Sequence, residues 1–587
     1  MSLHTYHATS VIPEIQIGDV VEIRDFSGFI PDESIGTDDE PGKWRLSDYL
    51  LIDGTPGKML NVRYTLQGDM NFSPDLLPPV IEIDLPLTGR YAIYMGVPTL
   101  DKKLRYETGV DAALDSEVFN NVEPMFGVRQ SKWLKEYNRE VILFFKNADL
   151  NGGNKLRIRV PFGTFTCYPY GFVRSMLSLI RFERLPDDAN LSREYGQPDE
   201  KSTKPLIVAV DGFSHYNMWG LPGECMDERL PEIYENTDVR MLFLQITAPM
   251  LWKSDVNNYF GENMTEEDYK GKRMGDIRLC KYMDWAIKSD NDPMTVMAKA
   301  CHDKGLQFHF SIRANLYFSN DSGEMENIEK FLNGNWWLEH PEHRMPDNKH
   351  LDYGKPEVRK YYLDIMREVL ERFDVDGISL DLTRWPRVLW KEYHDDSILI
   401  DFAREMRALL DSYEPKKGKK LALSMCFVEY YHAKTTLAEQ AVDLEGLLKA
   451  QVLDFVCLQT WDLKPWADLA RIYNTPMYGI WEGIPPYGNY IDPVLDPLWL
   501  AEDGGVQGDP LPGEEFIDQK PVNLQSPLEV GMVFDRYYRD GADGIYLSNN
   551  FLGYLPLRDM GKPGLVHERM EKEEIYGQRY GSYIFLM

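Results

Sequence analysis

The chain has 587 residues, of which 43% are hydrophobic and 12% aromatic, a composition typical of a globular protein. This length exceeds one ordinary hydrophobic core, so we expect two or three domains. With 64 basic and 94 acidic residues, the formal net charge of −30 argues against nucleic acid or an anionic membrane as a partner, because both require basic surfaces.

Residues 1–185 contain short β-rich runs separated by turn residues, a pattern typical of a β-sandwich. We expect this segment to form an N-terminal sandwich of the jelly-roll type. The next segment, residues 186–204, is rich in Pro, Asp, Ser and Lys and indicates a linker. The expected strands of the sandwich include Val20–Ile23, Val80–Asp84, Gly89–Tyr94, Val141–Phe145 and Leu156–Val160.

From residue 205 the pattern changes to short apolar runs that alternate with amphipathic helical segments. Continuous apolar runs are typical of parallel strands that are buried on both faces. The eight runs are Leu206–Val210, Arg240–Ile246, Gln307–Ile312, Gly377–Asp381, Lys420–Phe427, Asp454–Gln459, Pro476–Ile480 and Gly544–Ser548. They predict a TIM (β/α)8 barrel over residues 205–587, with a C-terminal extension.

A doubly wound open sheet is the alternative architecture for this segment. It would require a glycine-rich phosphate turn after its first strand, and residues 210–215 do not form one. Two long connections, from Ala248 to about Asp292 and from Trp481 to about Gln525, follow the second and seventh strands. Both fall on the C-terminal side of the predicted barrel, where loops of this length are commonly functional.

Polar or aromatic side chains stand at almost every predicted strand end, where barrel enzymes place their chemistry. The fourth strand ends in Asp381, an acid with no packing role in an apolar run, and Arg384 and Trp385 follow at once. Sugar sites commonly combine a carboxylate, a charged hydrogen-bonding group and an aromatic platform. The candidates at the other strand ends are Asp211, Gln245, Arg313, Asn315, Tyr317, Glu429, Tyr430, His432, Trp461, Asp462, Trp481, Glu482 and Asn549.

These groups favour glycoside hydrolysis. The reaction needs one carboxyl group to protonate the leaving oxygen and a second to attack the anomeric carbon or activate water. We expect Asp381 to be the nucleophile or general base. Glu429 is the expected general acid, and Glu482 is its main rival. The remaining candidates would bind the hydroxyl groups and faces of a carbohydrate substrate.

Purely structural roles stay open for several of these residues. Asp211 precedes a glycine and suits a turn, whereas Asp462 suits a helix cap. Arg313 suits a structural ion pair as well as an acidic sugar. His215 and His432 are more typical of hydrogen-bonded loop residues than of catalysts.

Other chemistry has less support. Metal-dependent barrels commonly carry a His-x-His pair on an early strand, but His309-Phe310-Ser311 lacks the second histidine, so no metal site or cofactor is expected. A serine hydrolase would require a Gly-x-Ser-x-Gly elbow, which the sequence does not contain. The six cysteines lack a Cys-x-x-Cys spacing and indicate neither a disulfide framework nor structural zinc.

The sequence also bears on localisation. It contains no run of about 18 apolar residues, so no membrane span is expected. Residues 1–4 lack the basic and apolar regions of a signal peptide. We expect a cytoplasmic protein, or a secreted or periplasmic one if a signal has been removed.

The segment Asp376-Gly377-Ile378-Ser379-Leu380-Asp381, with Arg384 and Pro386, resembles a motif of bacterial glycosyl hydrolase-like barrels of uncharacterised type. The resemblance covers about residues 205–552. It is also distantly similar to the α-amylase and α-galactosidase clans, which implies a nucleophilic role for Asp381 and an acid/base role for Glu429. The sequence departs from the amylase pattern in two places. It has Ser379 where the amylases have an arginine, and it has Glu482 where their third acid is an aspartate.

Together these observations predict a glycoside hydrolase that acts on an oligosaccharide or polysaccharide. Two alternatives stay open. One is a glycan-binding protein without catalysis, and the other is a barrel lyase or isomerase that acts on a sugar acid through a tyrosine or histidine base.

Overall fold

A computed structural model describes twelve stretches of the chain: residues 3–6, 15–66, 78–99, 110–122, 139–160, 171–191, 203–318, 328–390, 397–429, 436–481, 527–548 and 560–571. Short gaps remain within them at 39, 41, 51–53, 118, 190, 220–221, 223–225, 229, 235–236, 247, 263, 271–273, 316, 384–385 and 461. The chain divides into two compact units. One contains Met1–Thr203 with Ile484–Met532 and Leu552–Met587, and the other contains Lys204–Gly483 with Val533–Phe551.

The first unit is built from β-sheets around one apolar core. A five-stranded sheet has the order β1 (Leu3–Tyr6), β2 (Val20–Ile23), β13 (Leu179–Arg184), β7 (Thr88–Thr99), β10 (Arg139–Asn151). A second has the order β6 (Ile81–Leu85), β11 (Asn154–Arg159), β8 (Val110–Leu114), β9 (Asn120–Val122). A third has the order β12 (Gly171–Leu177), β5 (Pro56–Leu66), β4 (Trp44–Leu50), β3 (Ile35–Gly36). Most pairings are antiparallel, as predicted for this segment, whereas the jelly-roll arrangement stays a prediction.

The second unit is a closed barrel of eight parallel strands, which confirms the predicted (β/α)8 architecture. The strands are β14 (Leu206–Asp211), β15 (Val239–Ile246), β16 (Gln307–Arg313), β17 (Gly377–Asp381), β18 (Ala422–Val428), β19 (Phe455–Gln459), β20 (Met477–Trp481) and β21 (Gly544–Leu547). Each pairs with the next in chain order, and β21 pairs with β14 to close the ring. The predicted runs differ from these strands by at most two residues at an end.

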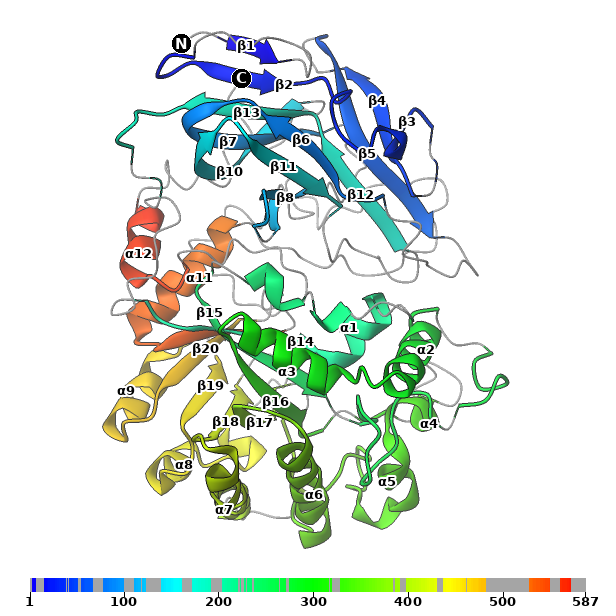
Figure 1. The fold of residues 1–587 in the computed structure, drawn as a ribbon. Helices are drawn as coiled ribbons and strands as arrows, with labels where there is room; N and C mark the ends of the chain where they lie inside the picture. Colours follow the sequence, from blue (N-terminus) through cyan, green and yellow to red (C-terminus); the bar gives the residue numbers. More distant parts are fainter. Residues whose placement is uncertain are drawn as a thin grey trace, which may run out of the picture. The chain divides into compact units, whose positions relative to one another are not determined.

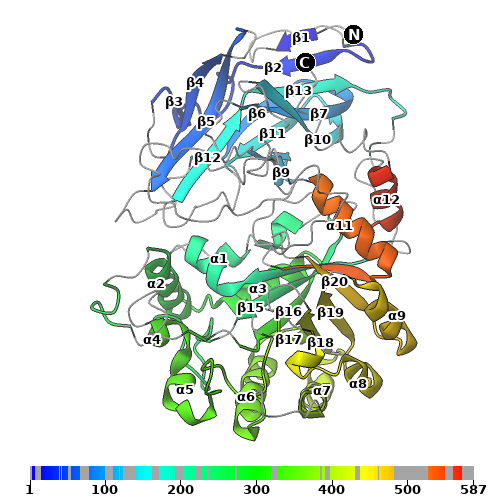
Figure 2. The same cartoon turned by 180° about the vertical axis from the view of Figure 1, so that it is seen from behind.

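Helices separate the strands and cover the outside of the barrel; α6 to α9 lie outside the strands in both Figure 1 and Figure 2. The main helices of this unit are α1 (Gly212–Trp219), α2 (Met274–Lys288), α3 (Pro293–Asp303), α4 (Ile328–Leu332), α5 (Gly334–Glu339), α6 (Pro356–Arg372), α7 (Ser397–Lys417), α8 (Leu444–Ala450) and α9 (Lys464–Ile472). Later in the chain, α11 (Pro527–Asp540) precedes β21, and α12 (Pro563–Glu571) follows it. At the start of α3, the carboxylate of Asp292 accepts a hydrogen bond from Thr295 N, and Pro293 occupies the first turn.

The inside of the barrel holds apolar side chains from several strands together with the buried polar residues His309, Ser311, Ser379 and Ser424. Because side chains alternate along a strand, every second residue points inward. Ile207 and Ala209 of β14, Phe243 of β15, and Cys426 and Cys457 of β18 and β19 belong to one buried cluster. Within the described residues, no helix is long and apolar enough to cross a bilayer.

Candidate active site

The inward-facing series reaches charged side chains at the C-terminal ends of β14, β16 and β17. The alternation that places Ile207 and Ala209 inside places Asp211 inside as well, and it brings Arg313 and Asp381 inward on β16 and β17. Arg313 and Asp381 are also direct partners in the register between these strands. Asp211, Arg313 and Asp381, three of the residues that sequence alone placed at strand ends, therefore face the same space.

Hydrogen bonds between strands that are not neighbours show that these side chains meet inside the ring. Arg313 Nη1 on β16 donates to Asp211 Oδ2 on β14 over 3.1 Å. Gln245 Nε2 on β15 donates to Asp381 Oδ2 on β17 over 2.6 Å and to Tyr546 Oη on β21 over 3.0 Å. Arg313 Nη2 completes the set by donating to Gln245 Oε1 over 3.1 Å. We call these five residues the cross-barrel network.

The carboxylate of Asp381 is fully enclosed, since its side chain has no exposed surface. Its Oδ2 accepts from Gln245 and lies 3.7 Å from Arg313 Nε. Its Oδ1 accepts from both the backbone nitrogen and the hydroxyl of Thr383, over 2.8 and 2.7 Å. A guanidinium and this many donors stabilise the ionised carboxylate, which is the form that a nucleophile or a general base requires.

Tyr546 is the member of the network that lies on β21. Burial raises the pKa of its hydroxyl well above the ordinary value of 10.0, and the nearby thiol of Cys426 and carboxylate of Asp381 raise it further. Tyr546 is therefore neutral, and its oxygen accepts the hydrogen bond from Gln245. The network contains two carboxyl groups and one guanidinium, so its fully ionised form carries one excess negative charge.

Glu429 follows β18 directly and lies in a different environment. Its Oε2 accepts from the indole nitrogen of Trp466 on α9 over 2.9 Å and from the hydroxyl of Thr460 over 3.3 Å. Its backbone nitrogen donates to Gln459 O over 2.8 Å, which continues the pairing of β18 with β19. Within the part of the chain that the structure describes, Oε1 of Glu429 accepts no hydrogen bond, and no cation lies beside the carboxylate.

Comparison with known proteins gives only distant likenesses. No family model and no curated protein matches the chain. Matching solved structures include a glycoside hydrolase family 18 N-acetylglucosaminidase from Paenibacillus barengoltzii, at 10% identity and a TM-score of 0.30, over 59% of this chain and 94% of that one. Another is alpha-L-fucosidase isoenzyme 2 from Paenibacillus thiaminolyticus, at 11% identity and a TM-score of 0.34, over 63% of this chain and half of that one. A third is the maltogenic alpha-amylase AmyB from Thermotoga neapolitana, at 14% identity and a TM-score of 0.30, over 63% and 77%.

These three neighbours are glycosidases of different kinds, and a chitinase-like agglutinin from Robinia pseudoacacia also matches, at 12% identity and a TM-score of 0.31 over 61% of this chain and 98% of that one. Likeness at this level does not indicate the reaction of this chain, so its function has to be inferred from its own side chains.

Other predicted site residues have contacts that hold the fold. Asn315 bonds to the backbone of Leu351 through both ends of its amide. The hydroxyl of Tyr317 lies 2.9 Å from that of Tyr362, and its ring stacks on Trp337. Trp481 packs edge-on against Phe534 of α11, and Asp462 is exposed. Seven further candidates lie outside the described residues: Arg384, Trp385, Tyr430, His432, Trp461, Glu482 and Asn549.

Four residues of the site, Tyr546, Trp466, Thr383 and Thr460, were not among the sequence-based candidates. Tyr546 lies within β21, and only the inward alternation along that strand could have indicated it. Trp466 is on α9, seven residues beyond the end of β19, and no local pattern connects it with Glu429. Thr383 stands two residues after Asp381, a spacing at which a side-chain carboxylate commonly accepts from the backbone, so this contact was predictable.

A second buried cluster lies next to β14 and contains His215. Asp227 is fully buried and accepts hydrogen bonds from Tyr216 and Tyr282, each over 2.7 Å. His215 Nε2 lies 3.9 Å from Asp227 Oδ1, and neither ring nitrogen has a hydrogen-bond partner among the described residues. Burial lowers the pKa of His215 to about 3 and raises that of Asp227 to about 7.

These two shifts have opposite effects on stability. Between pH 4 and 7 folded Asp227 holds a proton that the unfolded chain has lost, so its contribution to the free energy of unfolding falls as pH rises. Between pH 3 and 6.5 unfolded His215 holds a proton that the folded chain lacks, so its contribution rises with pH. The two slopes cancel from about pH 4 to 6.5.

Single substitutions should reveal how each group changes the free energy of unfolding with pH. Asp227→Asn should lose about 2–3 kcal/mol of unfolding free energy, relative to the wild type, when the pH falls from 6.5 to 4.5. His215→Phe should show the reverse trend over the same range, because only the Asp227 slope remains. Urea unfolding at pH 4.5, 5.5 and 6.5 measures both variants. Profiles parallel to that of the wild type in both would contradict the opposed shifts.

Proposed function

We propose that this protein is a glycoside hydrolase in which Asp381 acts as the nucleophile or general base and Glu429 as the general acid. One observation carries the proposal. Two buried carboxyl groups stand at the C-terminal ends of the adjacent strands β17 and β18, and their partners differ in kind. Asp381 lies beside a guanidinium, whereas Glu429 accepts from an indole and a hydroxyl.

This difference supports a division of roles. Glycosidases require one carboxylate to be ionised and the other carboxyl group to bring a proton to the leaving oxygen. The contacts of Asp381 stabilise its ionised form. Glu429 retains one oxygen, Oε1, that accepts no hydrogen bond from the described residues and that can carry the proton.

The charge of the network also suits this reaction. Glycoside hydrolysis passes through a transition state that resembles an oxocarbenium ion and is positive at the anomeric carbon. The excess negative charge shared by Asp211, Arg313 and Asp381 would stabilise that charge in a site of low dielectric constant.

The expected substrate is an oligosaccharide or polysaccharide. We assign its hydroxyl groups and ring faces to the aromatic and polar residues predicted around the strand ends, among them Arg384, Trp385, Trp461 and Asn549. We also propose that Glu482 is the alternative general acid and that residues 1–185 form a jelly roll. The separation of the two carboxyl groups in the complex would decide between retention and inversion.

A glycan-binding protein without catalysis is the second candidate. It is favoured by the enclosure of Asp381, because both oxygens of this carboxylate already accept hydrogen bonds and the side chain is fully buried. Such saturation suits a purely structural ion pair as well as a catalyst held ready for substrate.

Reducing-sugar release from a broad glycan panel separates the two candidates. Release by the wild type that is lost in a carboxylate variant supports the hydrolase. Binding to a glycan array without any release supports the second candidate.

Glu429→Gln provides a sharper test on any substrate that the panel identifies. We expect the variant to lower kcat/KM by roughly 10²–10⁴ on a natural glycoside, because a general acid contributes about that much. An aryl glycoside with a nitrophenol leaving group should lose much less, since that group departs without protonation. Equal losses on both substrates would assign the acid to another residue, with Glu482 first.

A further inference from the structure

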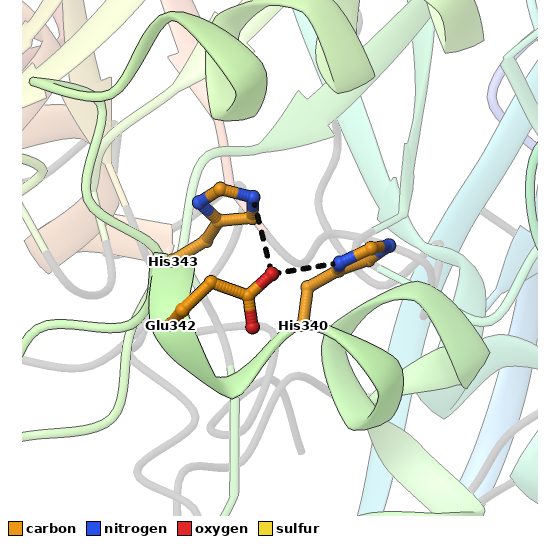
Figure 3. Close-up of side chains that lie close together, drawn as sticks. All are labelled: His340, Glu342 and His343. Carbon is orange, nitrogen blue, oxygen red and sulfur yellow. Dashed lines mark hydrogen bonds and ion pairs between the residues drawn. The ribbon is translucent and has the colours of Figure 1, made fainter.

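A compact group of potential metal ligands lies outside the cross-barrel network. His340, Glu342 and His343 stand where α5 ends, and Pro341–His343 form the single 3-10 turn η7. Because a 3-10 helix has three residues per turn, side chains three positions apart lie on the same side. Figure 3 shows the two imidazoles on either side of the Glu342 carboxylate.

The distances within this group match a metal coordination shell. Glu342 Oε1 lies 3.0 Å from His340 Nδ1 and 3.5 Å from His343 Nε2. The three candidate ligand atoms all lie within 4.8 Å of one another. In a tetrahedral zinc site with ligands at about 2.1 Å, neighbouring ligand atoms are roughly 3.4 Å apart, close to the two distances from Glu342.

The surrounding residues hold the two histidines in place. Trp336 stacks on His343 with ring centroids 5.5 Å apart and contacts His340 at 4.7 Å. Tyr361 of α6 stacks on the same indole at 4.1 Å. The turn itself is fixed by a hydrogen bond from Asp352 N to His343 O over 3.0 Å. Ligands held in this way lose little conformational freedom when an ion binds.

We propose that His340, Glu342 and His343 bind a divalent transition-metal ion, with water completing the coordination. Two imidazoles and one carboxylate suit Zn²⁺ and its neighbours in the first transition row, whereas Mg²⁺ and Ca²⁺ prefer oxygen ligands alone. No metal site was expected from the sequence because it lacks a His-x-His pair on an early strand. Ligands that lie together on one 3-10 turn do not follow that pattern.

The affinity should be below that of a closed structural zinc site. Glu342 is 59% exposed at its side chain, so water competes for its carboxylate. His343 Nδ1 is buried without a hydrogen-bond partner among the described residues. A histidine ligand normally donates that second N–H to an acceptor, and loss of such a contact weakens metal binding by about 10–100-fold.

Isothermal titration of the EDTA-treated full-length chain with ZnCl₂ tests the proposal. We expect His340→Ala, Glu342→Gln and His343→Ala each to remove one equivalent of bound Zn²⁺, or to weaken it at least tenfold. Glu339→Gln changes an exposed acid on the preceding turn and should bind Zn²⁺ as the wild type does. Circular dichroism of each variant checks that the fold is retained.

CoCl₂ gives an independent readout, because the visible absorption of bound Co²⁺ reports nitrogen ligation. Bands present in the wild type and absent in His343→Ala would support the site. The same two contacts of Glu342 would form in a plain hydrogen-bonded His–Glu–His group. Two results would overturn the proposal and leave a hydrogen-bonded group without metal. One is that the wild type does not bind Zn²⁺, and the other is that none of the three ligand variants changes the binding.

Discussion

Asp381→Asn is expected to lower kcat/KM by roughly 10³-fold or more on whichever glycoside the wild type cleaves. An amide can neither attack the anomeric carbon nor take a proton from water, so the loss should reach the upper part of the range for acid and base groups. Steady-state rates of wild type and variant on the same substrate measure it.

The fold should survive this substitution with a moderate cost. If the new amide nitrogen replaces Oδ2, it faces the donor Gln245 Nε2, and if it replaces Oδ1, it faces the backbone N–H of Thr383. One unfavourable contact between donors remains in either orientation, which costs about 1–3 kcal/mol. Circular dichroism and thermal unfolding therefore have to accompany the rates.

Asp468→Asn is the matched control for Asp381→Asn. Asp468 is a surface acid on α9 that pairs with Lys464 and Arg471, and its loss should leave the rate unchanged. Wild-type activity in Asp381→Asn would move the chemistry to Glu429 or Glu482.

Arg313→Met is expected to have the largest effect on stability, a loss of about 3–5 kcal/mol in the free energy of unfolding. The guanidinium is 4% exposed and lies between two buried carboxylates, at 3.1 Å from Asp211 and 3.7 Å from Asp381. Methionine fills much of the same volume, so the loss measures two buried carboxylates that no longer have the guanidinium beside them. Urea unfolding of wild type and variant gives the difference.

Two further variants distinguish charge from packing at this position. Adding Asp211→Asn to Arg313→Met removes one of the two uncompensated charges and should recover part of the lost stability. Arg313→Lys keeps the charge, but a single ammonium replaces the forked guanidinium that bonds to both Asp211 and Gln245. We therefore expect an intermediate loss of stability. A loss below about 1 kcal/mol in Arg313→Met would show that the network contributes little to stability.

The barrel was predictable because parallel strands buried on both faces leave apolar runs in the sequence. Gly377–Asp381 was predicted with the bounds that the structure has. Lys420–Phe427 was predicted two residues early, since β18 begins at Ala422. Lys420 pairs instead with Asp454 outside the ladder, a contact between strands that are adjacent only in the fold. Strand ends depend on such tertiary contacts more than on local composition.

The meeting of Asp211, Gln245, Arg313 and Asp381 was predictable for the same reason. A residue that ends an inward-facing series in a barrel has only the ring interior available to it. Asn315 and Tyr317 lie beyond that series, two and four residues after the end of β16, where alternation no longer fixes direction. Their bonds to Leu351 and Tyr362 depend on how the following segment folds back, which no local pattern in the sequence encodes.

The cross-barrel network also restricts how this chain can diverge. Arg313 bonds to Asp211 and Gln245, and Gln245 bonds to Arg313, Asp381 and Tyr546, so a change at either position removes a hydrogen bond from at least two other members. A lineage that loses Arg313 has to lose an acid at 211 or 381 in a nearby step, because the intermediate carries uncompensated buried charge. Changes of specificity should therefore arise in the loops beyond the strand ends. The five positions of the cross-barrel network should change together or stay unchanged.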